Sequence, residues 1–308
     1  MIIITQVYHF YIKLSMKLSM KPLIKPLIKP LAKPLAKPLM RPTINSPNRS
    51  TILKKPPKSD NSTNLINHQR YQSVDYISDV HIDAREINDI PRFFDVKSEI
   101  CILAGDVGDV DHENWFIFMH KLSQMYETVC FVPGNHDFGL GYCYQHSMYT
   151  DYTKKLQLAL TKFENIHYLD RGVYQHKSGI VIAGCCLWSN PLKITDENSL
   201  DHQNRHHGDV QWLSSIIESS QSKQLIIATH YVPTPKLIDN QYKLGSSPVQ
   251  SSYFVTDLGS MFKGFNAWIC GHTHSIIRTS INGIYFGVNA VGYNVDKFVM
   301  QTIELTKE

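Results

Sequence analysis

The first 59 residues contain neither aspartate nor glutamate, although they hold twelve of the 31 lysine and arginine residues of this 308-residue chain. All 27 acidic residues lie beyond that point, so the net charge of +4 combines a strongly basic tail with an acidic remainder. The basic balance therefore belongs to the tail alone. With 43% hydrophobic residues, the chain can bury a large core in one domain of about 240 residues.

The chain also lacks a C-x-x-C pair, a membrane-spanning apolar run and a secretory signal. Five of the six cysteines lie in or beside apolar runs, which favours buried free thiols in a reducing compartment. The apolar start, residues 1–12, includes Gln6 and His9 and is too short to span a bilayer. It has no basic beginning and no small-residue cleavage site. We therefore expect a soluble, intracellular (cytoplasmic) protein that is not secreted and has no transmembrane segment.

A four-residue unit that begins with lysine repeats seven times from Lys13, and from Pro22 onward each unit contains a proline. Proline removes a backbone donor and blocks helix, so we expect an extended, polyproline-like, disordered segment. We predict a low-complexity basic tail and linker over residues 1–68 and one globular domain over residues 69–308. The lysines could bind nucleic acid or an acidic membrane surface without sequence selectivity, but we favour a solvated extension.

Beyond residue 70, short apolar runs alternate with segments of helical or loop character. The expected strands are residues 74–78, 100–104, 128–132, 180–187, 224–229, 267–270, 284–288 and 298–305. The expected helices are residues 113–126, 152–163 and 210–218, the last capped by Gly208 or Asp209. Early crossovers and late hairpins predict an α/β fold of two packed β-sheets flanked by helices, a four-layer α/β/β/α sandwich.

Five short clusters of oxygen and imidazole donors follow apolar runs in a fixed order. They are Asp79-Val80-His81, Gly105-Asp106-Val107-Gly108-Asp109, Gly134-Asn135-His136-Asp137, Thr229-His230 and Gly271-His272-Thr273-His274. Strand ends would gather such residues at one sheet edge, and side chains two apart, such as Asp79 and His81, share a face. Taken singly, most of these clusters are also typical of ordinary turns or structural histidines. Only their convergence predicts a metal site.

In this order the clusters resemble the signature of the calcineurin-like metallophosphoesterase superfamily: D-x-H, G-D-x-x-D, G-N-H-D/E, H and G-H-x-H. The resemblance covers roughly residues 71–306, and the complete ordered set is much more specific than its parts. It implies two divalent metal ions. One ion would be bound by Asp79, His81, Asp106 and His274, and the other by Asp106, Asn135, His230 and His272, with Asp106 bridging them.

The resemblance also implies roles for residues beside the ions. His136 would contact phosphate and protonate the leaving oxygen, and Asp109 would orient His136. Asp137 is expected to shape its loop rather than to perform chemistry, and Asp83, which lies outside the pattern, is expected to be an exposed carboxylate.

This ligand set suits the hydrolysis of phosphate esters. Two carboxylates offset only half of the charge of two divalent ions, so the centre still attracts a phosphate anion. Ions about 3.5–4 Å apart can share one water and lower its pKa toward about 7, which makes a metal-bridging hydroxide the expected nucleophile. Four imidazoles and no cysteine ligand leave manganese, iron, zinc and cobalt as candidates and disfavour an all-magnesium centre.

The signature does not identify the substrate. Val110 and Pro133 stand where protein serine/threonine phosphatases of this superfamily carry arginine, which disfavours that branch. We expect phosphomonoesters or small phosphodiesters. The lysine repeat motivates a nuclease acting on DNA or RNA as one alternative, and a non-catalytic metal-bound interaction protein is another. Substrate contacts are expected from residues 138–150, with Tyr142, Tyr144 and His146, and residues 201–208, with Arg205, His206 and His207, although ordinary packing explains these side chains equally well.

Overall fold

The computed structural model describes residues 72–86, 95–139, 146–220, 224–238, 248–293 and 299–305. They all belong to the second of the chain's two units, His68–Glu308. The expected tail over residues 1–68, its disorder and the boundary at residue 69 lie outside the described residues and stay predictions. Within the described part, no helix is both long and apolar enough to cross a membrane. The five cysteines described there are buried free thiols, as expected.

The first sheet has five strands in the order β11-β1-β2-β3-β4. Their bounds are β1 (Gln72–Ile77), β2 (Ile100–Ala104), β3 (Thr128–Val132), β4 (Ile166–Tyr168) and β11 (Gln301–Leu305). Strands β1 to β4 run parallel, and β11 pairs antiparallel with β1 at the edge. Every residue of β2 and β3 is buried, which is the pattern of a parallel strand covered on both faces.

The second sheet has six strands in the order β5-β6-β7-β8-β10-β9. Their bounds are β5 (Gly172–Gln175), β6 (Val181–Cys185), β7 (Leu225–Thr229), β8 (Ala267–Cys270), β9 (Ile276–Ile281) and β10 (Ile284–Asn289). The central strands β6, β7, β8 and β10 are parallel, whereas the edge strands β5 and β9 are antiparallel to their neighbours. Asn282 and Gly283, both with positive φ (55° and 80°), make the tight turn of the β9–β10 hairpin.

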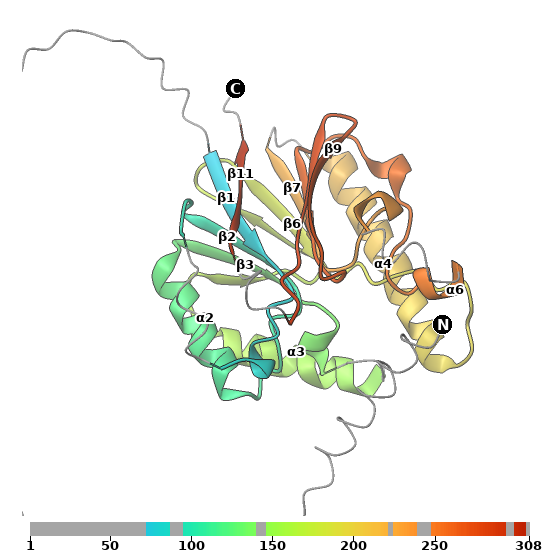
Figure 1. Ribbon diagram of the computed structural model, residues 1–308, viewed down its shortest axis with the longest axis horizontal. Coiled ribbons are helices and arrows are strands. Elements are labelled where there is room, and N and C mark those ends of the chain that lie inside the picture. The colour runs from blue at the N-terminus through green and yellow to red at the C-terminus, as the bar shows by residue number, and fades with distance from the viewer. Residues whose placement is uncertain are drawn as a thin grey trace, which may run out of the picture. The chain divides into compact units, whose positions relative to one another are not determined.

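The two sheets pack face to face, and helices cover their outer faces (Figure 1). Alternate residues of β2 divide between these layers: Ile100 and Ile102 pack with residues of the second sheet, whereas Leu103 packs on the helix side. The helices α2 (Glu113–Met125) and α3 (His146–Leu160) contact the first sheet, and α4 (Glu197–Ser219) contacts the second. A short helix, α6 (Pro248–Ser251), follows β7 in the chain. The expected four-layer α/β/β/α sandwich is therefore confirmed.

The start of α4 differs from the sequence prediction. The helix was expected from residue 210 with a cap at Gly208 or Asp209, but it begins at Glu197. Asp196 is the N-cap, because its side chain accepts the Ser199 N–H at 2.8 Å. Its additional turns have a mainly polar buried face, so they lack the apolar period that predicts a helix.

The carboxyl ends of β1, β2, β3, β7 and β8 lead into the five donor clusters. The sheets are also joined at this edge, because the Ser78 N–H donates to Asn289 O (2.9 Å) and the Val291 N–H donates to Ser78 O (3.0 Å). The fold thus brings segments from both sheets to one place.

Candidate metal centre

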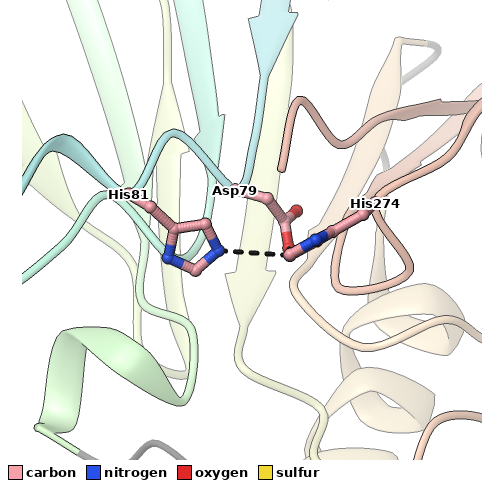
Figure 2. A group of neighbouring side chains, drawn as sticks. All are labelled: Asp79, His81 and His274. Carbon is pink, nitrogen blue, oxygen red and sulfur yellow. Dashed lines mark hydrogen bonds and ion pairs between the residues drawn. The ribbon is translucent and has the colours of Figure 1, made fainter. Parts of the chain in front are cut away.

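The first group of donors comes from the ends of β1 and β8. The His81 and His274 Nε2 atoms lie 3.2 Å apart, and His274 Nε2 lies 3.4 Å from Asp79 Oδ1. Figure 2 shows the two imidazole rings pointing toward each other beside the Asp79 carboxylate. Asp79 Oδ2 accepts hydrogen bonds from Ser78 Oγ (2.6 Å) and the His272 N–H (2.9 Å). The other oxygen, Oδ1, is buried and receives no hydrogen bond from the described residues, so it is the atom left for a cation.

The second group comes from the ends of β2, β3, β7 and β8. His230 Nε2 lies 3.3 Å from Asp106 Oδ2, 3.1 Å from Asn135 Oδ1 and 3.2 Å from His272 Nδ1. The opposite ring nitrogen, His230 Nδ1, lies 3.0 Å from the Ala104 carbonyl oxygen. A carbonyl can only accept, so Nδ1 carries a proton and His230 faces the cluster through Nε2, which would offer its lone pair to a cation once that atom is deprotonated.

Asp106 connects the two groups. Its Oδ2 lies 4.0 Å from His81 Nε2 as well as 3.3 Å from His230 Nε2, so one carboxylate faces both sets of donors. Its Oδ1 accepts the His136 backbone N–H at 2.8 Å, which fixes the plane of the carboxylate. This arrangement is the one that a bridging ligand requires.

The backbone at the cluster is conformationally strained. Of the nine described non-glycine residues with positive φ, five are candidate ligands: Asp79, His81, Asp106, His272 and His274, with φ between 45° and 68°. Such conformations cost roughly 1–3 kcal/mol each and tend to gather at functional sites. Close packing also leaves no room at Gly271, where an added Cβ would lie 2.5 Å from Asp79 Oδ2.

The electrostatics of the cluster call for positive charge. Burial lowers the pKa of His81 to about 4, and burial together with neighbouring His230 lowers that of His272 to about 3. Burial also opposes a charge on His230, but the Asp106 carboxylate outweighs it and raises the pKa of His230 to about 9. One imidazolium therefore faces two buried carboxylates while these neighbouring imidazoles stay neutral. Divalent cations would supply the missing charge and bind the neutral imidazoles.

The donors fit metal ions in type and spacing. Asp79, His81 and His274 form one group, and Asp106, His230 and His272 another, in which the ligand atoms lie within 4.8 Å of one another. Within the part of the chain that the structure describes, two buried atoms, Asp79 Oδ1 and His272 Nε2, have no hydrogen-bond partner. Burying such polar atoms costs free energy that a bound cation would offset. All seven candidate ligands from the sequence converge here. Their roles as ligands remain predictions.

The two candidate catalytic residues differ in position. His136 is half-buried beside the cluster, with its ring edge-on to His81 at a centroid distance of 4.8 Å. Asp109 is also half-buried, but its carboxylate accepts the Asp111 N–H (3.0 Å). Among the described residues no hydrogen bond joins Asp109 to His136, so the orienting role of Asp109 stays a prediction.

Asp137 shapes the loops, as expected. Its buried carboxylate accepts the backbone N–H groups of Asp106 (2.8 Å), Gly108 (3.0 Å) and Gly134 (2.7 Å). These bonds tie the loop after β2 to the loop after β3. Asp83 is an exposed carboxylate, also as expected.

The structure describes only part of the two segments that were expected to contact substrate. Arg205, His206 and His207 lie within α4, not in a loop. The Arg205 guanidinium pairs with Asp201 (2.9 Å) and covers the Tyr149 ring, so these contacts already engage it. Tyr142 and Tyr144 lie outside the described residues, as does the side chain of His146.

Several aromatic contacts of the cluster were not expected from the sequence. Tyr231 packs on His272 with ring centroids 4.0 Å apart, and buried Trp188 packs on Tyr231 at 5.9 Å. Tyr293 and Phe254 contact other faces of the cluster. Tyr231 could have been found because it follows His230 directly, and Trp188 because it follows the expected strand 180–187, but nothing in the local sequence connects Phe254 or Tyr293 to the site.

A further acidic group lies away from this edge. Glu99, Glu127 and His176 come within 4.8 Å of one another, next to the starts of β2 and β3. Lys177 Nζ lies 2.5 Å from Glu127 Oε2, so the Lys177 ammonium group already forms an ion pair with this carboxylate. The group therefore differs from the cluster at the carboxyl ends of the strands.

The chain was compared with protein-family models, with curated proteins and with solved structures. The model of the family described as calcineurin-like phosphoesterase matches residues 73–275. A protein of Acanthamoeba polyphaga mimivirus, Uncharacterized protein L509, is 27% identical over 264 residues, and the match covers 72% of this chain and 91% of that protein. The crystal structure of phosphopantetheinyl hydrolase from Mycobacterium tuberculosis is 14% identical with a TM-score of 0.54, covering 75% of this chain and 92% of that one. The structural likeness shows the fold alone.

Proposed function

Because the chain belongs to the calcineurin-like phosphoesterase family, whose members are metal-dependent hydrolases of phosphate esters, we propose that it hydrolyses phosphomonoesters or small phosphodiesters at a two-ion centre. The observation that carries this proposal is the position of Asp106, whose Oδ2 faces His81 in one donor group and His230 in the other. The ions are manganese, iron, zinc or cobalt, since the ligand set mixes imidazole and oxygen donors without thiolate.

The ligands divide into two sets that share Asp106. Asp79, His81 and His274 complete the set for one ion, and Asn135, His230 and His272 complete the set for the other. When bound, two such ions activate a water for in-line attack and stabilise charge on the phosphoryl oxygens. The hydrogen bonds from Ser78 and from the His272 backbone orient Asp79, and the Ala104 carbonyl holds the His230 tautomer.

His136 is the proton donor of the proposed reaction. Its backbone is held by Asp106 Oδ1, and its partly exposed ring borders His81, so it can reach a phosphate ester that occupies the centre. Protonation of the leaving oxygen by a positioned imidazole is typically worth about 10²- to 10⁴-fold in rate. It matters most when the leaving alkoxide is poor.

The test combines metal analysis with a small substrate panel. We expect the manganese-loaded chain to hydrolyse p-nitrophenyl phosphate or its bis ester. His136→Ala should lower kcat by about 10²- to 10⁴-fold and leave the metal content unchanged, because His136 is not among the proposed ligands. His120→Ala, which removes an exposed imidazole on α2, is the matched control. Loaded protein that cleaves neither ester would contradict the proposal, and turnover lost in His136→Ala would exclude a purely non-catalytic role.

The nuclease alternative rests on the lysine repeat, which lies outside the described residues. Deleting residues 1–60 should weaken salt-sensitive cleavage of DNA or RNA if the tail recruits nucleic acid. Unchanged cleavage would remove the tail from the proposal.

A further inference from the structure

Three aromatic side chains among the described residues are exposed: Phe116, Phe254 and Tyr293. Phe116 lies on α2 and packs against Phe163. The other two lie against histidines of the candidate metal centre, with 41% of Phe254 and 50% of Tyr293 exposed. Single exposed apolar side chains are common, but these two border the same site.

Tyr293 stacks on a ligand of the first donor group. Its ring lies 4.6 Å from the His81 ring, centroid to centroid, with an interplanar angle of only 18°. It also meets the His274 ring edge-on at 5.4 Å. Half of the Tyr293 side chain is exposed to solvent, so it offers aromatic surface next to the first donor group.

The position of Tyr293 is fixed by its neighbours. The Arg85 guanidinium donates to the carbonyl oxygens of Val80 and Gly292, which ties the residue before His81 to the residue before Tyr293. Gly292 has φ of 64°, and an added Cβ would lie 2.7 Å from His274 Nδ1, so the turn packs directly on that ligand. A ring held in place before binding loses little conformational entropy when a ligand stacks on it.

Phe254 borders the second donor group. Its ring lies 5.3 Å from the His272 ring at 36°, and His272 also packs on buried Tyr231 at 4.0 Å. The adjacent Val255 forms a β-bridge with Val232, which anchors this segment to the loop that carries His230. An aromatic ring thus borders each donor group of the centre.

We propose that Tyr293 and Phe254 form an aromatic subsite that selects phosphate esters whose organic part carries a flat aromatic ring, such as a nucleobase. The inference rests on the proposed function, because the phosphate must lie at the metal centre. Tyr293 provides the stacking face beside the first donor group, and Phe254 provides an apolar contact beside the second. Stacking of one base on an aromatic side chain contributes about 5- to 150-fold in affinity, and it tolerates different bases since each has a π-face.

The test compares two monoesters that differ only by the base. Adenosine 5′-monophosphate and ribose 5-phosphate are titrated into the manganese-loaded full chain by calorimetry, and their hydrolysis is followed by phosphate release. We expect the nucleotide to bind at least about fivefold more tightly. Tyr293→Ala should remove most of this preference, whereas Tyr293→Phe should keep it. Phe254→Ala should also reduce the preference for the nucleotide. Phe116→Ala, at an exposed phenylalanine of α2, is the matched surface control.

Each other outcome has a distinct meaning. Equal affinity for both esters in the wild type would overturn the subsite while leaving the proposed function intact. If Tyr293→Ala lost affinity equally for both esters and also bound less metal, the proposed subsite would be overturned too, because Tyr293 would then only position His81. A wild type that neither binds nor cleaves either ester would contradict the proposed function as well. Thermal unfolding of each variant confirms that the comparison is made on folded protein.

Discussion

At the scale of single residues, the candidate centre is held by groups that are not themselves ligands. Ser78 Oγ and the His272 N–H occupy one oxygen of Asp79, which leaves the other directed at His274. Asp137 holds three backbone N–H groups around Asp106. Five candidate ligands keep a left-handed backbone conformation because hydrogen bonds of this kind hold the surrounding loops in place.

Ser78→Ala tests this support. Loss of the 2.6 Å hydrogen bond to Asp79 Oδ2 frees the carboxylate to rotate, although the His272 N–H still holds it. We expect metal affinity to fall about 10- to 100-fold, the usual effect of removing an outer partner of a ligand, as measured by competition with a fluorescent chelator. Ser73→Ala removes a β1 hydroxyl that donates to the Lys97 carbonyl away from the centre, and it should leave the metal affinity unchanged. Equal affinities in the two variants would contradict the proposed ligand orientation.

The sequence could identify the side chains that meet but not how they are supported. Residue types and strand ends were enough to predict the convergence of Asp79, Asp106 and His230. The stacking of Tyr293 on His81 was not predictable, because the two residues are far apart in the sequence and meet only through a turn with positive φ. The expected pairing of Asp109 with His136 depended on loop torsions that the sequence pattern does not encode.

At the scale of elements, α4 braces the end of β6. Asp209 Oδ2 accepts the Leu187 N–H (2.8 Å), and His206 Nδ1 donates to the Leu187 carbonyl (2.9 Å). These bonds hold Leu187 and Trp188 in left-handed conformations, and Trp188 packs on Phe138 beside the loop after β3. The buried stripe of the helix is Ser199, His202, His206, Asp209 and Leu213. Its spacing is helical, but its residues are mostly polar, so hydrophobic periodicity could not reveal it.

This brace makes stability depend on pH. Burial raises the pKa of Asp209 from 3.8 to about 7, despite its ion pair with Arg171. The folded protein therefore binds more protons than the unfolded chain between those values, and the contribution of Asp209 to stability falls as pH rises through that window. From pH 5 to 7.5, the unfolding free energy of the wild type should fall relative to Asp209→Asn by roughly 2–3 kcal/mol.

Urea unfolding at the two pH values measures this difference. Asp151→Asn, which alters an exposed carboxylate on α3, is the control for a general charge effect. A difference between wild type and Asp209→Asn that is the same at both pH values would show that Asp209 is ionised throughout and that its pairing with Arg171 outweighs burial.

At the scale of the whole described fold, the central strands and the edge strand β11 were predictable, whereas β4, β5 and β9 were not. Strands such as β2 and β7 are continuous apolar runs because both faces are covered. By contrast, β4 is only three residues long, while β5 and β9 have exposed or half-buried residues throughout, so their sequences give little signal. The candidate ligands are divided between the sheets, with Asp79 and Asp106 from the first and His230 and His274 from the second. A bound ion would therefore cross-link the two sheets.

Metal removal should consequently destabilise the fold as a whole. Ions that bind only the folded chain at about 100 times their Kd stabilise it by about 2.7 kcal/mol, which corresponds to roughly 5–10 °C in Tm for a domain of this size. We expect chelation with EDTA to lower the Tm by that amount in scanning calorimetry, and excess manganese to restore it. Asp106→Ala, which removes the carboxylate shared by both donor groups, should unfold at the same temperature with and without chelator. A wild type whose Tm ignores both treatments would contradict a metal centre between the sheets, because no cation could then be offsetting the buried carboxylates of Asp79 and Asp106.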